Sequence, residues 1–280
     1  MDNEVSPEQA SMVLNMLTGG GSMDTINTPL ALRLIGLAED LGQEELAQRL
    51  LDHALNAAKD DSERFWTQFE GLKMASSPIP SFERLAEELA TTDGMNDLEA
   101  AVQHHLALMH LAEEQLTEAR AVIQRSVSLR EMSNDREGIT YGLAVLVAVA
   151  KRQHDMDTAI AAGTQRIELL NSLHKHRAKM EALADLAHAQ ATIGEFSVAR
   201  NLFEESLELA KELESLSGQL VARWGLADLA EIAEDYQSAM LVLSDCLHAY
   251  MAENQPTPAA VKQRIQDLTA LKANVRKEDA

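Results

Sequence analysis

Apolar residues recur along this chain at intervals of three and four positions, in segments separated by short polar breaks. Such spacing places apolar side chains on one side of an α-helix, so the pattern predicts a series of amphipathic helices. The breaks at Gly42, His154, Gly194 and Glu234 each separate two apolar segments. We therefore expect tight turns there, each joining two antiparallel helices.

Four of these segments are in register and begin at Leu106, Leu146, Leu186 and Leu226, so each starts forty positions after the one before; they are 106–127, 146–167, 186–207 and 226–247. Each has a larger apolar residue ten positions after this Leu, and Ala three positions after that. The repeated alanines are Ala119, Ala159, Ala199 and Ala239. A small side chain is expected where the second helix of a pair crosses the first closely. Because so short a pair cannot bury its apolar face alone, the pairs are expected to stack into a solenoid.

The pattern changes toward both ends of the chain. A fifth unit, 34–55, keeps Leu34 and Ala47, and a shortened unit follows it, with helices predicted near 61–75 and 81–91. A short helix ending near Leu17 precedes the repeats, and it is either a mobile leader or a helix that folds back over the groove. A last helix, from about 258 to 274, has Ile265, Leu268 and Leu271 as its apolar stripe. We expect a helix and Gly-rich leader over 1–27, helical repeats over 28–254, and a capping helix and tail over 255–280.

The repeats resemble the tetratricopeptide repeat family. The resemblance is carried by Leu–small pairs such as Leu106-Ala107 and Leu186-Ala187, by the Gly194-x-Phe196 turn, and by the repeated alanines. The usual repeat of this family is about 34 residues long, so the longer repeat of this chain implies helices about one turn longer. The resemblance implies an all-α fold, a right-handed α-solenoid of antiparallel helix pairs with a C-terminal capping helix. It also implies that the first helices of successive pairs line a concave groove that binds peptides or partner helices.

Composition supports an all-α chain and restricts its partners. Of 280 residues, 46% are hydrophobic and only 4% aromatic, and Ala, Leu and Glu, which favour helices, are abundant. The 45 acidic and 24 basic residues give a net charge of −21, which argues against nucleic acid and anionic membrane surfaces and favours a basic partner. The longest apolar run, 143–150, is too short to span a bilayer, and no signal peptide is evident. We expect a soluble, cytoplasmic protein.

No catalytic or cofactor signature is present, so we expect neither enzyme activity nor a cofactor. Glu181, Asp185 and His188 are spaced by four and three residues and share one helix stripe. They could hold a divalent ion, but acidic helix stripes are usually solvated, and we expect no metal. Cys246, the only cysteine, cannot form an intramolecular disulfide and is expected to be a small buried packing residue, because other units have Ala54, Ser126 and Ser206 at that position.

The repeat frame also predicts which side chains line the groove and bind a partner. Tyr141 and Trp224 would act as aromatic anchors, and acidic residues would select a basic segment. Ordinary amphipathic packing, against the N-terminal helix or another molecule, is the alternative interpretation. The predicted partner-binding residues are His104, Tyr141, Arg152, Glu181, Asp185, His188, Trp224, Asp228 and Glu231.

These observations favour a non-catalytic scaffold or adaptor that binds a protein or a peptide, either basic or amphipathic, in the groove. A regulatory sensor that binds a signalling peptide and acts through another protein is a second hypothesis. A self-assembling structural protein, and so a homo-oligomer, is a third.

Overall fold

The computed structural model describes residues 7–278, and the side chains of residues 12–271. Residues 1–6 of the predicted leader and 279–280 of the tail lie outside this range. The described residues form fourteen helices and no strand, which confirms the all-α prediction. The helices are α1 (Pro7–Thr18), α2 (Thr28–Asp40), α3 (Glu44–Ala57), α4 (Asp61–Met74), α5 (Ile79–Ala90), α6 (Asn96–Ala112), α7 (Leu116–Met132), α8 (Arg136–Arg152), α9 (Met156–Ser172), α10 (His176–Thr192), α11 (Phe196–Glu212), α12 (Leu216–Ile232), α13 (Tyr236–Ala252) and α14 (Ala259–Glu278). The described residues form two compact units, which divide between residues 110 and 111.

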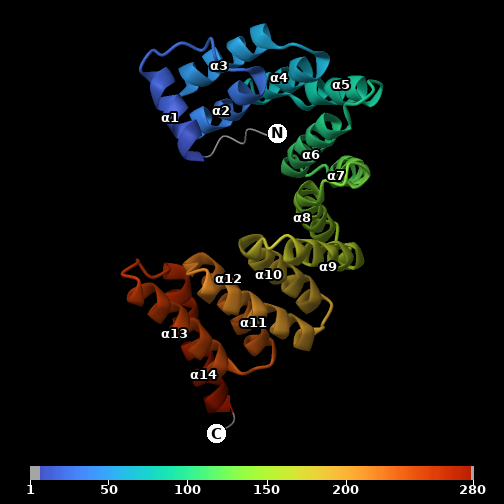
Figure 1. Cartoon of the computed structure of the whole chain (residues 1–280). Coiled ribbons are helices and arrows are strands. Elements are labelled where there is room, and N and C mark those ends of the chain that lie inside the picture. The colour runs from blue at the N-terminus through green and yellow to red at the C-terminus, as the bar shows by residue number, and fades with distance from the viewer. Residues whose placement is uncertain (1–6, 279–280) are drawn as a thin grey trace. The chain divides into compact units, whose positions relative to one another are not determined.

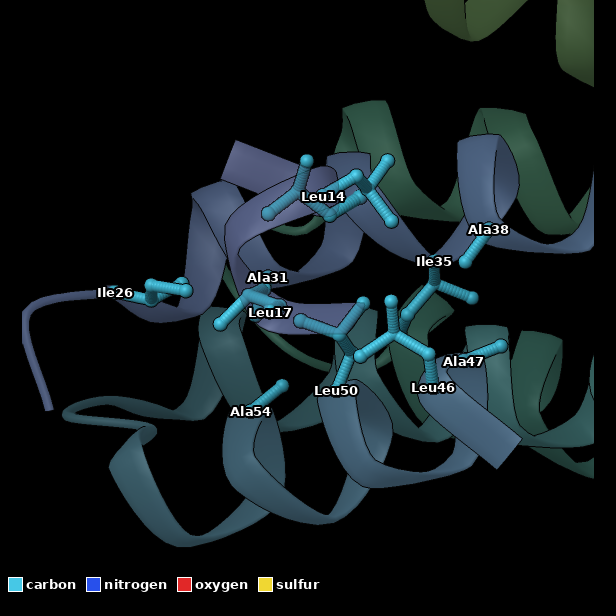
Figure 2. Close-up of a cluster of buried hydrophobic side chains, with 11 residues drawn as sticks. Leu14, Leu17, Ile26, Ala31, Ile35, Ala38, Leu46, Ala47, Leu50 and Ala54 are labelled. Carbon is cyan, nitrogen blue, oxygen red and sulfur yellow. The ribbon is translucent and has the colours of Figure 1, made fainter. Parts of the chain in front are cut away.

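In the first unit, α1 belongs to the hydrophobic core. Leu14 and Leu17 are buried together with Ala31 and Ile35 of α2 and Leu50 of α3 (Figure 2). The turn that follows α1 is also fixed, because the backbone carbonyl of Ile26 lies 2.7 Å from Nε2 of His53. The N-terminal helix therefore packs on the first repeat and is not a loose leader.

The second helix pair of this unit is shortened, as the sequence predicts. Its helices α4 and α5 have 14 and 12 residues, whereas each helix from α6 to α13 has 17. The ring of Phe69 on α4 meets Trp66, Phe82 and His105 edge-on at centroid distances of 6.2, 6.1 and 5.8 Å. His105 belongs to α6, so this aromatic cluster joins the shortened pair to the next helix.

From α7 to α13 every pair of successive helices is separated by three residues, which form the same turn each time. In the turn after α7, the amide of Asn134 donates to the carbonyl of Glu131 at 3.2 Å, and the amide of Asp135 donates to that of Arg130 at 2.9 Å. This is the Schellman arrangement, which needs a left-handed residue after the helix. The carboxylate of Asp135 then accepts from the amide of Gly138 at 2.8 Å and caps α8.

The left-handed residues of these turns are evenly spaced along the chain. From α7 to α13 they are Asn134, His154, His174, Gly194, Glu214 and Glu234, and Glu114 before α7 and Asn254 after α13 continue the series, with φ between 52° and 87°. Two helices and two turns of this kind add up to one repeat of the sequence pattern, so the turn geometry is the physical origin of the period seen in the sequence.

The small residues of the repeat lie where the sequence predicts. Ala47, Ala119, Ala159, Ala199 and Ala239 are all 0% exposed. Cys246 is likewise fully buried, and burial raises the pKa of its thiol. Their burial confirms the prediction that small side chains at these positions let the helices pack closely.

In the second unit, successive helices stack side by side (Figure 1), and α8, α10 and α12 also contact one another in succession. The last helix, α14, buries Val261 and Leu268 against residues of α12 and α13. Of its predicted stripe, Leu268 is buried and Ile265 partly buried, but Leu271 is exposed. No helix in the described part of the chain is both long enough and apolar enough to span a bilayer.

Candidate binding groove

Eight of the nine predicted partner-binding residues lie on α8, α10 and α12, the three helices of the second unit that contact one another in succession. We call the sides of these helices that carry these residues the groove face. The residues are Tyr141 and Arg152 on α8, Glu181, Asp185 and His188 on α10, and Trp224, Asp228 and Glu231 on α12. The ninth, His104, is half-buried on α6 in the first unit.

A pocket of about 340 Å³ opens between α10 and α12. Ser206 of α11 also lines it, and the hydroxyl of Ser206 donates to the carbonyl of Met180 at 2.9 Å. Gly218 lets α12 approach α10 here, because a Cβ at this position would lie 2.4 Å from Sδ of Met180. The complete lining is Met180, Glu181, Ala184, Asp185, His188, Ser206, Ser217, Gly218 and Val221. Three of the predicted residues are thus brought together in one cavity.

His188 forms a partly buried wall of this pocket. Its ring packs edge-on against Phe203, with 4.9 Å between ring centroids. Burial, followed by the charge of Lys151, lowers the pKa of His188, and the nearby Asp228 and Asp185 oppose this shift. The lowered pKa favours the neutral form of the imidazole, so His188 contributes mainly polarity to the pocket.

The two carboxylates of the pocket, Asp185 and Glu181, differ in their pairing with basic side chains of the same chain. Asp185 lies 3.4 Å from Nζ of Lys151 on α8 and 3.7 Å from Nη1 of Arg166 on α9. Burial lowers the pKa of Arg166, and the charges of Asp185 and Glu181 counteract this effect. Glu181 is exposed and has no salt bridge within the described residues. It is therefore the acidic group of the pocket that is most available to a ligand.

At the other end of the groove face, α14 supplies the contacts of three predicted residues. The guanidinium of Arg264 lies over the ring of Trp224, 4.5 Å from its centroid. The same group donates to the carboxylates of Asp228 and Glu231, the latter through Nε at 2.8 Å. The sequence assigned these side chains to a partner, but in the structure a basic side chain of the same chain already engages them.

The two predicted residues of α8 also have partners within the chain. The hydroxyl of Tyr141 donates to Glu137 at 3.0 Å, and Glu137 in turn pairs with Lys175 at 2.8 Å. These hydrogen bonds lower the pKa of Glu137 and raise that of Tyr141. Arg152 pairs with Glu114 at 2.7 Å. Tyr141 is nevertheless 53% exposed, so its ring remains open to a ligand.

Sequence reasoning missed two arginines that shape this surface, Arg166 and Arg264. Arg166 could have been found, because residue 166 is Arg at the repeat position where residues 126, 206 and 246 are Ser or Cys. Arg264 lies in the last helix, which is displaced from the repeat frame by the segment 255–258, so the frame gives no equivalent position for it.

A metal site is not assembled in the described part of the chain, where no group of three or more His, Cys, Asp or Glu side chains could hold an ion. Glu181, Asp185 and His188 do share one helix stripe. However, Asp185 is directed toward Lys151 and Arg166, which compete with any cation for its oxygens.

No family model matches the sequence, and no curated protein matches it. Solved structures do match the fold. The C-terminal part of a TPR repeat-containing protein from Cytophaga hutchinsonii has a TM-score of 0.57 at 12% identity, covering 92% of this chain and 93% of that one. A signal transduction ATPase with a tetratricopeptide repeat sensor, from Pyrococcus horikoshii, has a TM-score of 0.61 at 14% identity, covering 89% of this chain and 41% of that one. The APC/C hetero-tetramer Cut9-Hcn1 has a TM-score of 0.59 at 13% identity, covering 93% of this chain and 46% of that one. The chain therefore has the fold of tetratricopeptide repeat proteins.

Proposed function

We propose that the chain is a non-catalytic, cytoplasmic scaffold or adaptor that binds a basic or amphipathic segment of a protein or peptide on its groove face. The observation that carries this proposal is the pocket between α10 and α12, where the exposed carboxylate of Glu181 stands beside apolar walls. A ligand that matches this surface has both a cationic and an apolar part. The similarity to Cut9-Hcn1, which was crystallised as a hetero-tetramer, adds support for a protein partner.

The exposed apolar side chains of the groove face fit the same proposal. Tyr141 on α8 and Val221 on α12 are 53% and 46% exposed. Tyrosine is enriched among the residues that dominate binding free energy, and burial of an exposed valine adds a smaller hydrophobic contribution.

The test begins with selection of binders from a random peptide library on the full chain. Dissociation constants of the selected peptides are then measured by calorimetry for the wild type, for Val221→Ser and for Val198→Ser. Val198, on α11, is 40% exposed and serves as a control of matched size away from the pocket. Val221 is already half-buried, so completing its burial contributes on the order of 0.7 kcal/mol, and Val221→Ser should weaken binding about threefold. Equal affinity of both variants would contradict binding at the groove face.

A sensor is the second candidate, and the similarity to an ATPase with a tetratricopeptide repeat sensor favours it. In a sensor, the bound peptide must select one of two conformations of the chain. Small-angle X-ray scattering with and without a selected peptide separates the candidates: a sensor changes its scattering curve, whereas a scaffold keeps it.

A further inference from the structure

The chain places an arginine side chain against carboxylates on each side of the pocket between α10 and α12. On one side this is Arg166, which reaches Asp185, and on the other it is Arg264, which reaches Asp228 and Glu231. These two internal contacts show which chemistry the groove face accommodates.

Arg166 occupies a repeat position that is otherwise small. The equivalent residues Ser126, Ser206 and Cys246 are at most 1% exposed, and Arg166 on α9 is itself only 8% exposed. Its side chain is long enough to reach from α9 to the carboxylate of Asp185 on α10. Arg166 thus brings a guanidinium from α9 to the groove-face carboxylate of Asp185 on α10.

Arg264 reaches the groove face from α14. Its guanidinium stacks on Trp224 and hydrogen-bonds to Asp228 and Glu231, and its side chain is only 15% exposed. Stacking on an aromatic face combined with a carboxylate is the environment that guanidinium groups prefer.

The pocket between these two sites has neither an arginine at the repeat position of Arg166 nor a tryptophan at that of Trp224. Ser206 stands one repeat after Arg166, and Ala184 stands one repeat before Trp224. None of the residues that line the pocket is Lys or Arg. The pocket, of about 340 Å³, therefore has no basic side chain in its own lining.

We propose that this pocket receives an arginine side chain of the partner, a refinement that rests on the proposed function. The apolar side chains of Met180, Ala184 and Val221 pack along the aliphatic stem, and the unpaired carboxylate of Glu181 accepts from the guanidinium. Arginine is favoured over lysine because its planar group is more weakly hydrated and pairs with carboxylates in a fixed geometry.

The test uses the peptides selected on the full chain, with each arginine replaced in turn by citrulline, which keeps the shape and removes the charge. Affinities are measured by calorimetry for the wild type and for Glu181→Gln. With the wild type, replacing one arginine of each peptide should lower the affinity about tenfold. With Glu181→Gln the same replacement should leave the affinity unchanged, since the two groups are coupled. Glu204→Gln, an exposed position on α11, is the control of equal charge change and should keep the full dependence.

A steric variant tests the same pocket without changing its charge. Ala184→Leu adds apolar volume to the lining of the cavity and offers no aromatic face on which a guanidinium could stack. It should lower the affinity for arginine peptides at least tenfold, with circular dichroism as the check of folding. Glu181→Gln, at an exposed position, gives the answer if the larger side chain prevents folding.

The two proposals fail in different ways. Peptides that depend on Val221 but show no arginine coupled to Glu181 would overturn the arginine pocket and leave the scaffold proposal standing. If no peptide binds the full chain, both proposals are overturned. A coupled arginine, found with the wild type and Glu204→Gln but not with Glu181→Gln, supports both.

Discussion

Gly225 on α12 shows how a single missing methyl group controls helix packing. A Cβ at this position would lie 2.2 Å from the ring of Phe203, which is buried and can move aside only by displacing its neighbours. Alanine favours a helix over glycine by about 1 kcal/mol, but overpacking costs about 1–3 kcal/mol. Gly225→Ala should therefore lower the free energy of unfolding by about 1 kcal/mol, measured by urea denaturation.

Gly36 provides the matched control for this prediction. It lies in the exposed interior of α2, and a Cβ there would meet nothing within 4 Å. Gly36→Ala should raise the free energy of unfolding by up to about 1 kcal/mol. Two substitutions of the same kind should thus have opposite signs, and equal signs would contradict the packing at Gly225.

His188 should make stability depend on pH. Its pKa is lowered in the folded state, so below the unfolded value of about 6.5 the unfolded chain binds more protons than the folded one. The stabilising effect of the neutral ring is complete above that value and is lost as the pH falls below it. Between about pH 7 and pH 5, the wild type should lose more stability than His188→Gln in denaturant titrations. A loss of equal size in both would show that His188 does not titrate in this way. Lys151, Asp185 and Asp228 are the charged groups that act on it.

The sequence predicts residue burial well where it follows the repeat. The regularly spaced alanines and Cys246 are buried as expected, because small size at one repeat position has one simple explanation. Arg166 departs visibly from this repeat position, but its burial could not be predicted in the same way. Burial of an arginine depends on a carboxylate from another helix, and composition and periodicity do not show that pairing.

Between the helices, several turns place a glutamate at a left-handed position that glycine adopts more easily. Glu214 follows α11 with φ of 52°, a conformation that costs a residue with a side chain about 1 kcal/mol relative to glycine. Glu214→Gly should therefore raise the free energy of unfolding by about 0.5–1 kcal/mol, measured by thermal and urea denaturation.

Two other turns calibrate this prediction. Asn134 has φ of 56°, and asparagine tolerates this region, so Asn134→Gly should change stability less. Gly194 already has glycine at φ of 87°, so Gly194→Ala should destabilise the chain. Any other order of the three variants would mean that contacts of the side chains outweigh the backbone conformation.

The boundaries of the regular helices could be predicted from the sequence, because the polar breaks at His154, Gly194 and Glu234 coincide with left-handed residues. The predicted ranges of α4 and α5 are also within a few residues of the structure. The packing of α1 was not predictable. Leu14 and Leu17 reveal an apolar face, but nothing in the sequence states which helices cover it.

For the second unit as a whole, Arg264 anchors the last helix through ion pairs with α12. Arg264→Ala removes the cation–π contact with Trp224 and leaves Asp228 and Glu231 without their partner. A loss of about 2 kcal/mol is expected from these contacts, together with faster amide hydrogen exchange in α14. Lys262→Ala, an exposed position on the same helix, should leave exchange unchanged. Equal exchange in both variants would show that apolar packing alone holds α14.

The position of the groove face follows from the repeat, because each period returns the same side of every second helix to the same surface. Which side chains contact this face does not follow from the repeat. Trp224, Asp228 and Glu231 were expected to await a partner, yet α14 lies outside the periodic frame and supplies Arg264 to them. Contacts made by the non-periodic ends of a repeat chain are the part that periodicity cannot predict.

Because the turns are equally spaced, the chain consists of interchangeable repeat units. Residues that close one helix and start the next recur at positions 135, 155, 175, 195, 215 and 235 with nearly the same backbone geometry. A segment one full repeat long, cut between two such joints, could be removed or duplicated, and the remaining helices would still meet at an intact joint. The length of the groove is thus an adjustable property of this architecture, independent of the chemistry of any one pocket.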